Sequence, residues 1–224
     1  GISQFYAAKS ALLLGVERVI PILQQCAQQN ERYSEEATSL AVRKMRYTEA
    51  RQWLKELSQS PQHIRKAIQG IGAFGDPAFI PTLISYMDTN EIARVAGESF
   101  SLITGIDLAY DDLEKDWPEG FEAGPNEDPK DDNVDMDEDE DLPWPDSKLI
   151  NKWWDKNKGS FKTSTRYFMG KPITDAWLND ILINGFQRQR SAAALELTLR
   201  NPETILFETR APGFEQQKKL LVSK

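Results

Sequence analysis

Few residues in this chain could carry out catalysis. It contains a single histidine, His63, and a single cysteine, Cys26. A Ser-His-Asp triad or a Cys-His pair would have to use His63, which follows Pro61 in the exposed first turn of an expected helix. Ordinary zinc sites need more His and Cys, and Gly70 and Gly72 lie inside a helical pattern rather than in a phosphate-binding loop. The sequence predicts no catalytic, cofactor-binding or metal-binding residue, and we expect that the chain is not an enzyme.

Carboxylates are abundant and are concentrated between residues 111 and 146. This segment contains 17 Asp or Glu against two Lys, a net charge of −15. The alternating oxygen ligands of residues 131–139 are typical of a Ca²⁺ loop. However, Met136 stands where an EF-hand loop has Gly, and Leu142 stands where it has its bidentate Glu. The EF-hand motif therefore fails, and only loose, low-affinity binding of a divalent cation is compatible with the pattern.

The acidic segment contrasts with the rest of the chain, which carries +7 because the total is −8. The two parts should attract each other. One interpretation is that residues 131–141 form a solvated, disordered spacer, as charge blocks usually do. Trp117, Phe121 and Trp144 are large anchors, which favours packing of the flanks against helices. Another interpretation is that the segment mimics a polyanion and covers a basic groove until a stronger anionic partner displaces it.

Lysines surround a pair of tryptophans between residues 152 and 162. Interleaved cations and aromatic rings can hold single-stranded nucleic acid by charge neutralisation and stacking, with Lys152 and Lys156 as the candidate residues. The competing interpretation is that Trp153 and Trp154 seal the end of a helical stack. The local pattern favours the second interpretation.

Helices must position all of these side chains, because apolar residues recur at a spacing of three to four along most of the chain. The turn residues agree with this pattern. Residues 61–74 are expected to form a helix that begins with Pro. Gly75 is expected to end this helix, and Asp76 is expected to cap the next one. Asp146 and Thr174 are expected to cap later helices. No segment shows convincing alternation with a period of two, so we expect essentially no sheet.

The helical pattern repeats along the chain. Residues 7–23 match residues 67–83 at an offset of 60, and Gly105 follows Gly75 at half that offset. The unit is therefore about 30 residues long, which is typical of stacked helix pairs that cannot bury their apolar faces alone. The opening residues match the second helix of a pair, which leaves open whether a longer N-terminal part precedes them.

Short motifs at these positions carry a family resemblance. An Arg stands two residues before a small residue early in the second helix, and a Gly-Asp-Pro turn precedes the first helix. The motifs are Arg65-Lys66-Ala67, Arg94-Val95-Ala96, Arg190-Ser191-Ala192 and Gly75-Asp76-Pro77-Ala78-Phe79-Ile80-Pro81. They resemble HEAT-like repeats of the phycobilisome-lyase type. The resemblance implies an all-α fold, an α-α superhelix or HEAT-like solenoid, with a long acidic and mostly irregular insertion.

A narrower resemblance covers most of the chain from Ala67 onward. Its segments are Arg94 to Asp107, the acidic stretch with Leu142-Pro143-Trp144-Pro145, and Gln187-Arg188-Gln189-Arg190. They are similar to an uncharacterised proteobacterial family of HEAT-like proteins. This resemblance implies no established activity, but it points to partners in bacterial secretion or effector-handling systems, for example of the type VI kind. A repeat Arg typically ties neighbouring repeats through carbonyls or carboxylates, and a direct ligand role is the alternative.

We expect one continuous solenoid that is interrupted in the middle by the acidic insertion. HEAT-like repeats would occupy residues 1–110, the acidic irregular insertion residues 111–146, and a further repeat with a C-terminal tail residues 147–224, stacked on the same solenoid. No apolar run approaches the ~18 residues of a membrane span. The lone cysteine cannot form an internal disulfide, and no secretory signal is present, which favours a reducing, cytoplasmic setting.

These observations predict a non-enzymatic protein-interaction scaffold or adaptor whose helical surface is modulated by the acidic insertion. The candidate interaction residues are Arg65, Arg94, Arg188, Arg190, Lys152, Lys156, Trp117 and Trp144. The alternative is a nucleic-acid-binding or DNA-glycosylase-like HEAT protein with a groove masked by the acidic segment. The net charge of −8 opposes this alternative, because phosphates are repelled by an acidic protein. The oligomeric state stays open.

Overall fold

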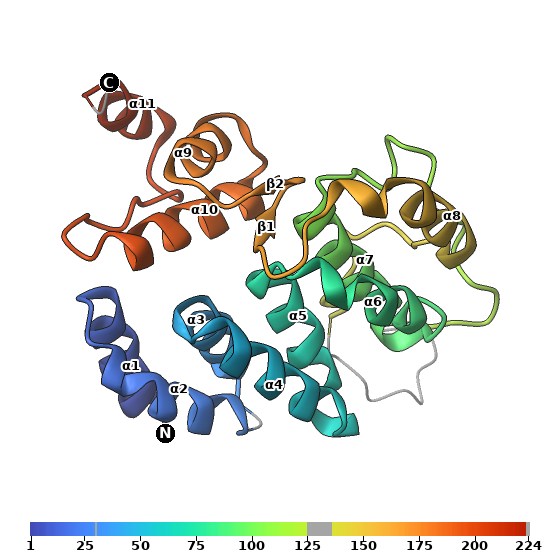
Figure 1. Cartoon of the computed structure of the whole chain (residues 1–224), viewed down its shortest axis with the longest axis horizontal. Helices are drawn as coiled ribbons and strands as arrows, with labels where there is room; N and C mark the ends of the chain where they lie inside the picture. Colours follow the sequence, from blue (N-terminus) through green and yellow to red (C-terminus); the bar gives the residue numbers. More distant parts are fainter. Residues whose placement is uncertain (30, 125–135, 223–224) are drawn as a thin grey trace.

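The structure is a computed structural model that describes residues 1–29, 31–124 and 136–222. Within these ranges the chain forms eleven α-helices (Figure 1). The helices are α1 (Ile2–Leu13), α2 (Ile20–Ala27), α3 (Ser34–Lys44), α4 (Tyr47–Ser58), α5 (Ile64–Phe74), α6 (Ile80–Tyr86), α7 (Asn90–Thr104), α8 (Ser147–Asn157), α9 (Asp175–Asn184), α10 (Gln187–Arg200) and α11 (Gly213–Val222). Short 3-10 helices span Glu17–Val19, Pro61–His63, Pro77–Phe79 and Lys158–Ser160. No helix in the described ranges has the length and apolar character that crossing a membrane requires.

The expectation of a helical protein with essentially no sheet is confirmed for the described residues. Their two strands, β1 (Tyr167–Phe168) and β2 (Lys171–Pro172), have two residues each and pair antiparallel. Asp76, Asp146 and Thr174 accept hydrogen bonds from main-chain N–H groups at the starts of their helices, as expected. The expected helix over residues 61–74 begins as a 3-10 turn, and its α-helical part starts only at Ile64.

Each of the first eight helices packs on at least one other helix of this group. Helices α2, α3, α5 and α7 follow one another, while α4 packs on α5, α6 packs on α7 and α8 packs on α6 (Figure 1). The glycines inside α5 explain how closely these helices approach. A Cβ on Gly70 would lie 2.7 Å from a methyl carbon of Leu54 on α4, and a Cβ on Gly72 would lie 2.9 Å from the hydroxyl of Ser99 on α7. Helix α5 therefore sits in contact with both neighbours, with its apolar side chains in the main core.

Helices α9 and α10 pack chiefly on each other and enclose a second, smaller core. The buried residues of this core are Phe168, Leu178, Ile181, Leu182, Ala193 and Ala194. Helix α10 also contacts α1 and α3, and Leu102 of α7 packs against the second core. The division of the chain into segments 1–110, 111–146 and 147–224 stays a prediction.

Residues 166–170, which we call the strap, cross the C-terminal ends of α5 and α7. The N–H group of Tyr167 donates to the carbonyl of Gly75 at 2.7 Å, and that of Met169 donates to the carbonyl of Leu102 at 2.7 Å. The last carbonyls of a helix have no partner within the helix. The strap supplies partners for them and so connects the two helix ends to the C-terminal part of the chain.

Replacing Gly75 by Ala should destabilise the protein strongly. Gly75 ends α5 with φ of 78°, and a Cβ there would overlap the carbonyl oxygen of Tyr167. The left-handed backbone alone costs a non-Gly residue about 1–2 kcal/mol, and the overlap with the strap adds to this. In urea unfolding, Gly75→Ala should lower the free energy of unfolding by more than about 2 kcal/mol.

Gly213→Ala is the matched control, because no atom lies within 4 Å of a Cβ built on Gly213. It should change the free energy of unfolding by less than about 0.5 kcal/mol. Equal effects of the two substitutions would contradict the proposed contact between α5 and the strap.

Candidate interaction site

Arg65 of α5 and Arg94 of α7 reach the same acidic turn of the insertion. The Nη1 and Nη2 groups of Arg65 donate to the two carboxylate oxygens of Asp139 at 2.9 and 2.6 Å. Arg94 donates to the main-chain carbonyl of Asp139 at 2.9 Å and to the carboxylate of Asp137 at 2.8 Å. We call these four residues the arginine clamp. It fixes one short turn of the insertion on two neighbouring helices.

The clamp is largely withdrawn from water. Arg94 is 3 % exposed and Asp139 is 5 % exposed. The hydrogen bond from Arg94 lowers the pKa of Asp137 below its usual value, and the bond to Asp139 raises the pKa of Arg65. Hydrogen bonds between charged groups are strong, and removing one partner of a buried pair leaves an uncompensated charge. The acidic turn is therefore held firmly rather than resting on the surface.

Aromatic side chains from both flanks of the insertion complete the environment of Arg94. Its Cζ atom lies 4.7 Å from the ring centroid of Trp144 and 5.3 Å from that of Trp117. The Trp117, Phe121 and Trp144 rings pack on one another with centroids 5.2 to 6.1 Å apart. Trp144 is buried, and Trp117 is half exposed. The flanks thus pack against the helices, and cation–π contacts add to the clamp.

The insertion begins and ends at the same place. The N–H group of Lys115 donates to the carbonyl of Trp144 at 2.8 Å, and that of Asp146 donates to the carbonyl of Leu113 at 2.9 Å. These main-chain bonds hold the two flanks side by side. The clamp then ties the acidic turn between these flanks to α5 and α7.

Most of the Ca²⁺-loop pattern lies outside the described residues, because residues 125–135 include Asp131, Asn133 and Asp135. In the part of the chain that the structure does describe, no group of three or more His, Cys, Asp or Glu side chains is arranged to hold a metal ion. Asp137 and Asp139, the described members of the pattern, bind arginines instead.

A cleft lies between the acidic turn, α7 and the start of α10. It consists of two adjoining cavities of about 470 and 320 Å³ that share Glu98, Leu142 and Arg188. Burial raises the pKa of Glu98, although the nearby Arg188 opposes the shift. The charged residues around the cleft are Glu35, Arg65, Glu98, Asp107, Glu138, Asp139, Asp141 and Arg188. Six of these eight are carboxylates, so the cleft carries excess negative charge.

The other predicted surface residues lie apart from the clamp. Arg188 borders the cleft, with Nη2 3.9 Å from the carboxylate of Asp141. Arg190 donates to the carbonyl of Leu182 at 2.8 Å and to Gln216 at 2.6 Å, which ties the end of α9 to α11. Exposed side chains of α8 include Lys152 and Lys156. Of the eight candidate residues, the structure brings together Arg65, Arg94, Trp117 and Trp144.

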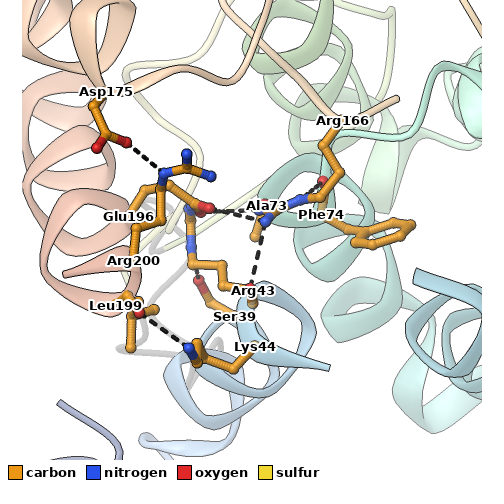
Figure 2. A network of polar contacts seen from close by, with 10 residues as sticks. All are labelled: Ser39, Arg43, Lys44, Ala73, Phe74, Arg166, Asp175, Glu196, Leu199 and Arg200. Carbon is orange, nitrogen blue, oxygen red and sulfur yellow. Dashed lines mark hydrogen bonds and ion pairs between the residues drawn. The ribbon is translucent and has the colours of Figure 1, made fainter. Parts of the chain in front are cut away.

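Sequence reasoning missed a buried ion-pair network that joins α3 to α10 (Figure 2). Glu196 of α10 is 1 % exposed. It accepts one hydrogen bond from Arg43 at 2.7 Å and two from Arg166 at 2.8 and 2.9 Å. Burial opposes ionisation, but the two guanidinium groups lower the pKa of Glu196. The available signal was a single carboxylate between Leu195 and Leu197 in an apolar stretch of helix.

Neither the single histidine nor the single cysteine belongs to these sites. His63 lies in the 3-10 turn before α5, and Cys26 is a free thiol buried in α2. Neither lines the cleft.

Comparison with known proteins adds no assignment. No protein-family model, curated protein or solved structure matches the chain. The resemblance to HEAT-like repeats therefore rests on the sequence motifs, and the function has to be argued from the geometry of the clamp and the cleft.

Arg94→Ala should destabilise the protein by about 3–5 kcal/mol, because it removes one partner of a buried charged pair. The same change should alter the near-ultraviolet circular dichroism, since Trp117 and Trp144 lose the cation between them. Arg46→Ala is the control, because that side chain is 85 % exposed and pairs with Glu49 on the surface. It should cost less than about 0.5 kcal/mol in urea unfolding. A small effect of Arg94→Ala would show that the clamp does not hold the turn.

Glu98→Gln should stabilise the protein at neutral pH. Burial raises the pKa of Glu98, so its ionisation costs more free energy in the folded state than in the unfolded state. The wild type therefore loses stability as pH rises from the unfolded pKa of about 4.3 through the raised folded pKa. The variant should exceed the wild type at pH 7 to 8, with the smallest difference below pH 4. Urea unfolding across this range measures the effect, and a pH-independent difference would refute it.

Proposed function

We propose that this chain is a non-enzymatic protein-interaction scaffold or adaptor built as a HEAT-like solenoid. Its support is the successive packing of α2, α3, α5 and α7 together with the sequence unit of about 30 residues. Arg65 and Arg94 stand at corresponding positions of two successive repeats. Stacked helix pairs of this kind present an extended surface that is suited to holding another macromolecule.

The arginine clamp is the observation that carries the proposal. Because Arg65 and Arg94 both bind the insertion, the acidic turn forms part of the helical surface. Without the turn, two repeat arginines would face a partner. With it, a partner meets the carboxylates around Glu98. The insertion thus modulates the surface by setting its charge.

A protein partner fits this surface better than nucleic acid. The carboxylates of Glu98, Asp107 and Asp141 would repel phosphates, and the clamp already commits the repeat arginines. At the rim of the cleft, Phe186 is 72 % exposed. An exposed aromatic ring beside charged groups is typical of protein interfaces. The complementary partner presents a basic segment to the cleft.

Two narrower parts of the proposal rest on the sequence. A cytoplasmic location is favoured by the single cysteine, and a partner from a bacterial secretion or effector-handling system is suggested by the family resemblance. The nucleic-acid-binding or glycosylase-like function is the alternative, and the experiment below separates the two.

Affinity capture from the cells that express the protein should recover a protein partner that survives nuclease treatment. The double substitution Phe186→Ala with Asp141→Lys removes the exposed ring and reverses one rim charge, so it should reduce the recovered partner at least about tenfold. Both side chains are exposed, so folding should be unaffected. Quantitative mass spectrometry measures the recovery.

Lys55→Glu, on the exposed face of α4, is the control and should recover the partner as the wild type does. Recovery that disappears after nuclease treatment would favour the nucleic-acid alternative. Undiminished recovery by the double variant would show that the cleft is not the binding surface.

A further inference from the structure

A separate cavity of about 380 Å³ lies where α3, the strap, α9 and α10 meet (Figure 2). Its lining residues are Arg43, Lys44, Arg166, Asp175, Glu196, Leu199, Arg200 and Asn201. Four of them are cationic, two are carboxylates, and only Leu199 is apolar. The lining therefore carries a net charge of +2. This charge is opposite in sign to that of the cleft at the other end of α10.

The positive charge is not balanced inside the cavity wall. Glu196 binds both Arg43 and Arg166, but one carboxylate neutralises only one guanidinium group. The side chains of Arg43 and Glu196 are 6 % and 2 % exposed. Burial lowers the pKa of Arg43, and repulsion from Arg166 adds to this shift. The cations beyond this buried pair are partly exposed, with Lys44 at 17 %, Arg166 at 20 % and Arg200 at 41 %, so the cavity presents its excess positive charge to an anion that enters it.

Neighbouring groups compensate only in part. Arg166 also donates to the carbonyl of Phe74 at 2.7 Å, at the end of α5. Helix C-termini offer about half a negative charge at most. Lys44 lies 2.9 Å from the carboxylate of Glu17, but this Glu side chain is 60 % exposed. Asp175 is already bound by Arg200 at 2.7 Å.

Guanidinium N–H groups remain for a ligand. Arg43 donates through Nε to Ser39 at 3.3 Å and through Nη1 to Glu196. Arg200 donates through Nε to Asp175. Among the described residues, the Nη2 group of Arg43 and both Nη groups of Arg200 have no acceptor. Planar guanidinium groups match the oxygens of phosphoryl groups well.

We propose that this cavity binds a dianionic phosphoryl group. A charge of −2 balances the lining, and its oxygens can accept from Arg43 and Arg200 with Lys44 as an additional cation. The donors come from α3 on one side and α10 on the other, so a bound phosphoryl group ties these two helices together and stabilises the folded chain. The site is distinct from the clamp and the cleft, and it does not depend on the scaffold function.

Isothermal titration of the whole chain with inorganic phosphate at pH 7.5 and constant ionic strength tests this site. The wild type should bind one phosphate with a submillimolar Kd. Arg200→Gln and Lys44→Gln should each weaken binding at least about tenfold, while both leave the buried Arg43–Glu196 pair in place. Lys158→Gln is the control, because this Lys side chain is 57 % exposed and pairs with Asp155 away from the cavity. It should bind phosphate as the wild type does.

The absence of binding at millimolar phosphate would overturn the proposal, as would unchanged affinity in Arg200→Gln. Tighter binding of citrate or acetate than of phosphate would overturn the phosphoryl assignment. Titration with glycerol phosphate identifies the source of the group. Tighter binding than inorganic phosphate supports an organic phosphate ester, and weaker binding supports free phosphate.

Discussion

The guanidinium group of Arg94 is almost fully withdrawn from water, and its charge is tolerated because Asp137 and the main chain of Asp139 accept its hydrogens. Moving a charged group out of water costs several kcal/mol, and only well-placed partners offset that cost. The acidic turn therefore cannot leave α7 without stranding a buried cation between Trp117 and Trp144. An anionic partner that displaced the turn would have to replace all of these contacts at once. The cost of displacing the turn therefore favours a turn that permanently forms a wall of the cleft over a turn that acts as a removable cover.

The same physical solution recurs where helices end. Lys66 donates to the carbonyls of Ala27, the last residue of α2, and of Gln29 just after it. Arg190 donates to the carbonyl of Leu182 near the end of α9. The last carbonyls of a helix carry partial negative charge and lack intrahelical partners, so a cation from another element satisfies them and links the two elements. In this acidic chain, many of the polar contacts between elements thus depend on Lys and Arg side chains, which are fewer than the carboxylates.

The sequence was informative where structure is local and uninformative where it is not. The caps at Asp146 and Thr174 depend on N–H groups two or three residues away, and such short-range signals are visible in the residue order. Arg65 and Arg94 were identified as candidates because the repeat places them, but their acidic partners were not, since Asp137 and Asp139 look like every other member of a charged run. The pairing of Arg43 with Glu196 spans 153 positions. A sequence period cannot predict a contact between residues so far apart, because this contact arises only when α10 packs against α3.

Helix α10 connects the two sites that differ most in charge. Its first turn, with Gln187 and Arg188, borders the acidic cleft, and its last turn, with Leu199 and Arg200, borders the basic cavity. Both turns belong to one helix of 14 residues, so the position of α10 on α3 affects the shape of both sites. The Arg43–Glu196 bond fixes that position from the side of α3, and the strap fixes it through Arg166. The carboxylate of Glu196 is the common end of both connections, which makes its ionised, buried state a condition for the geometry of each site.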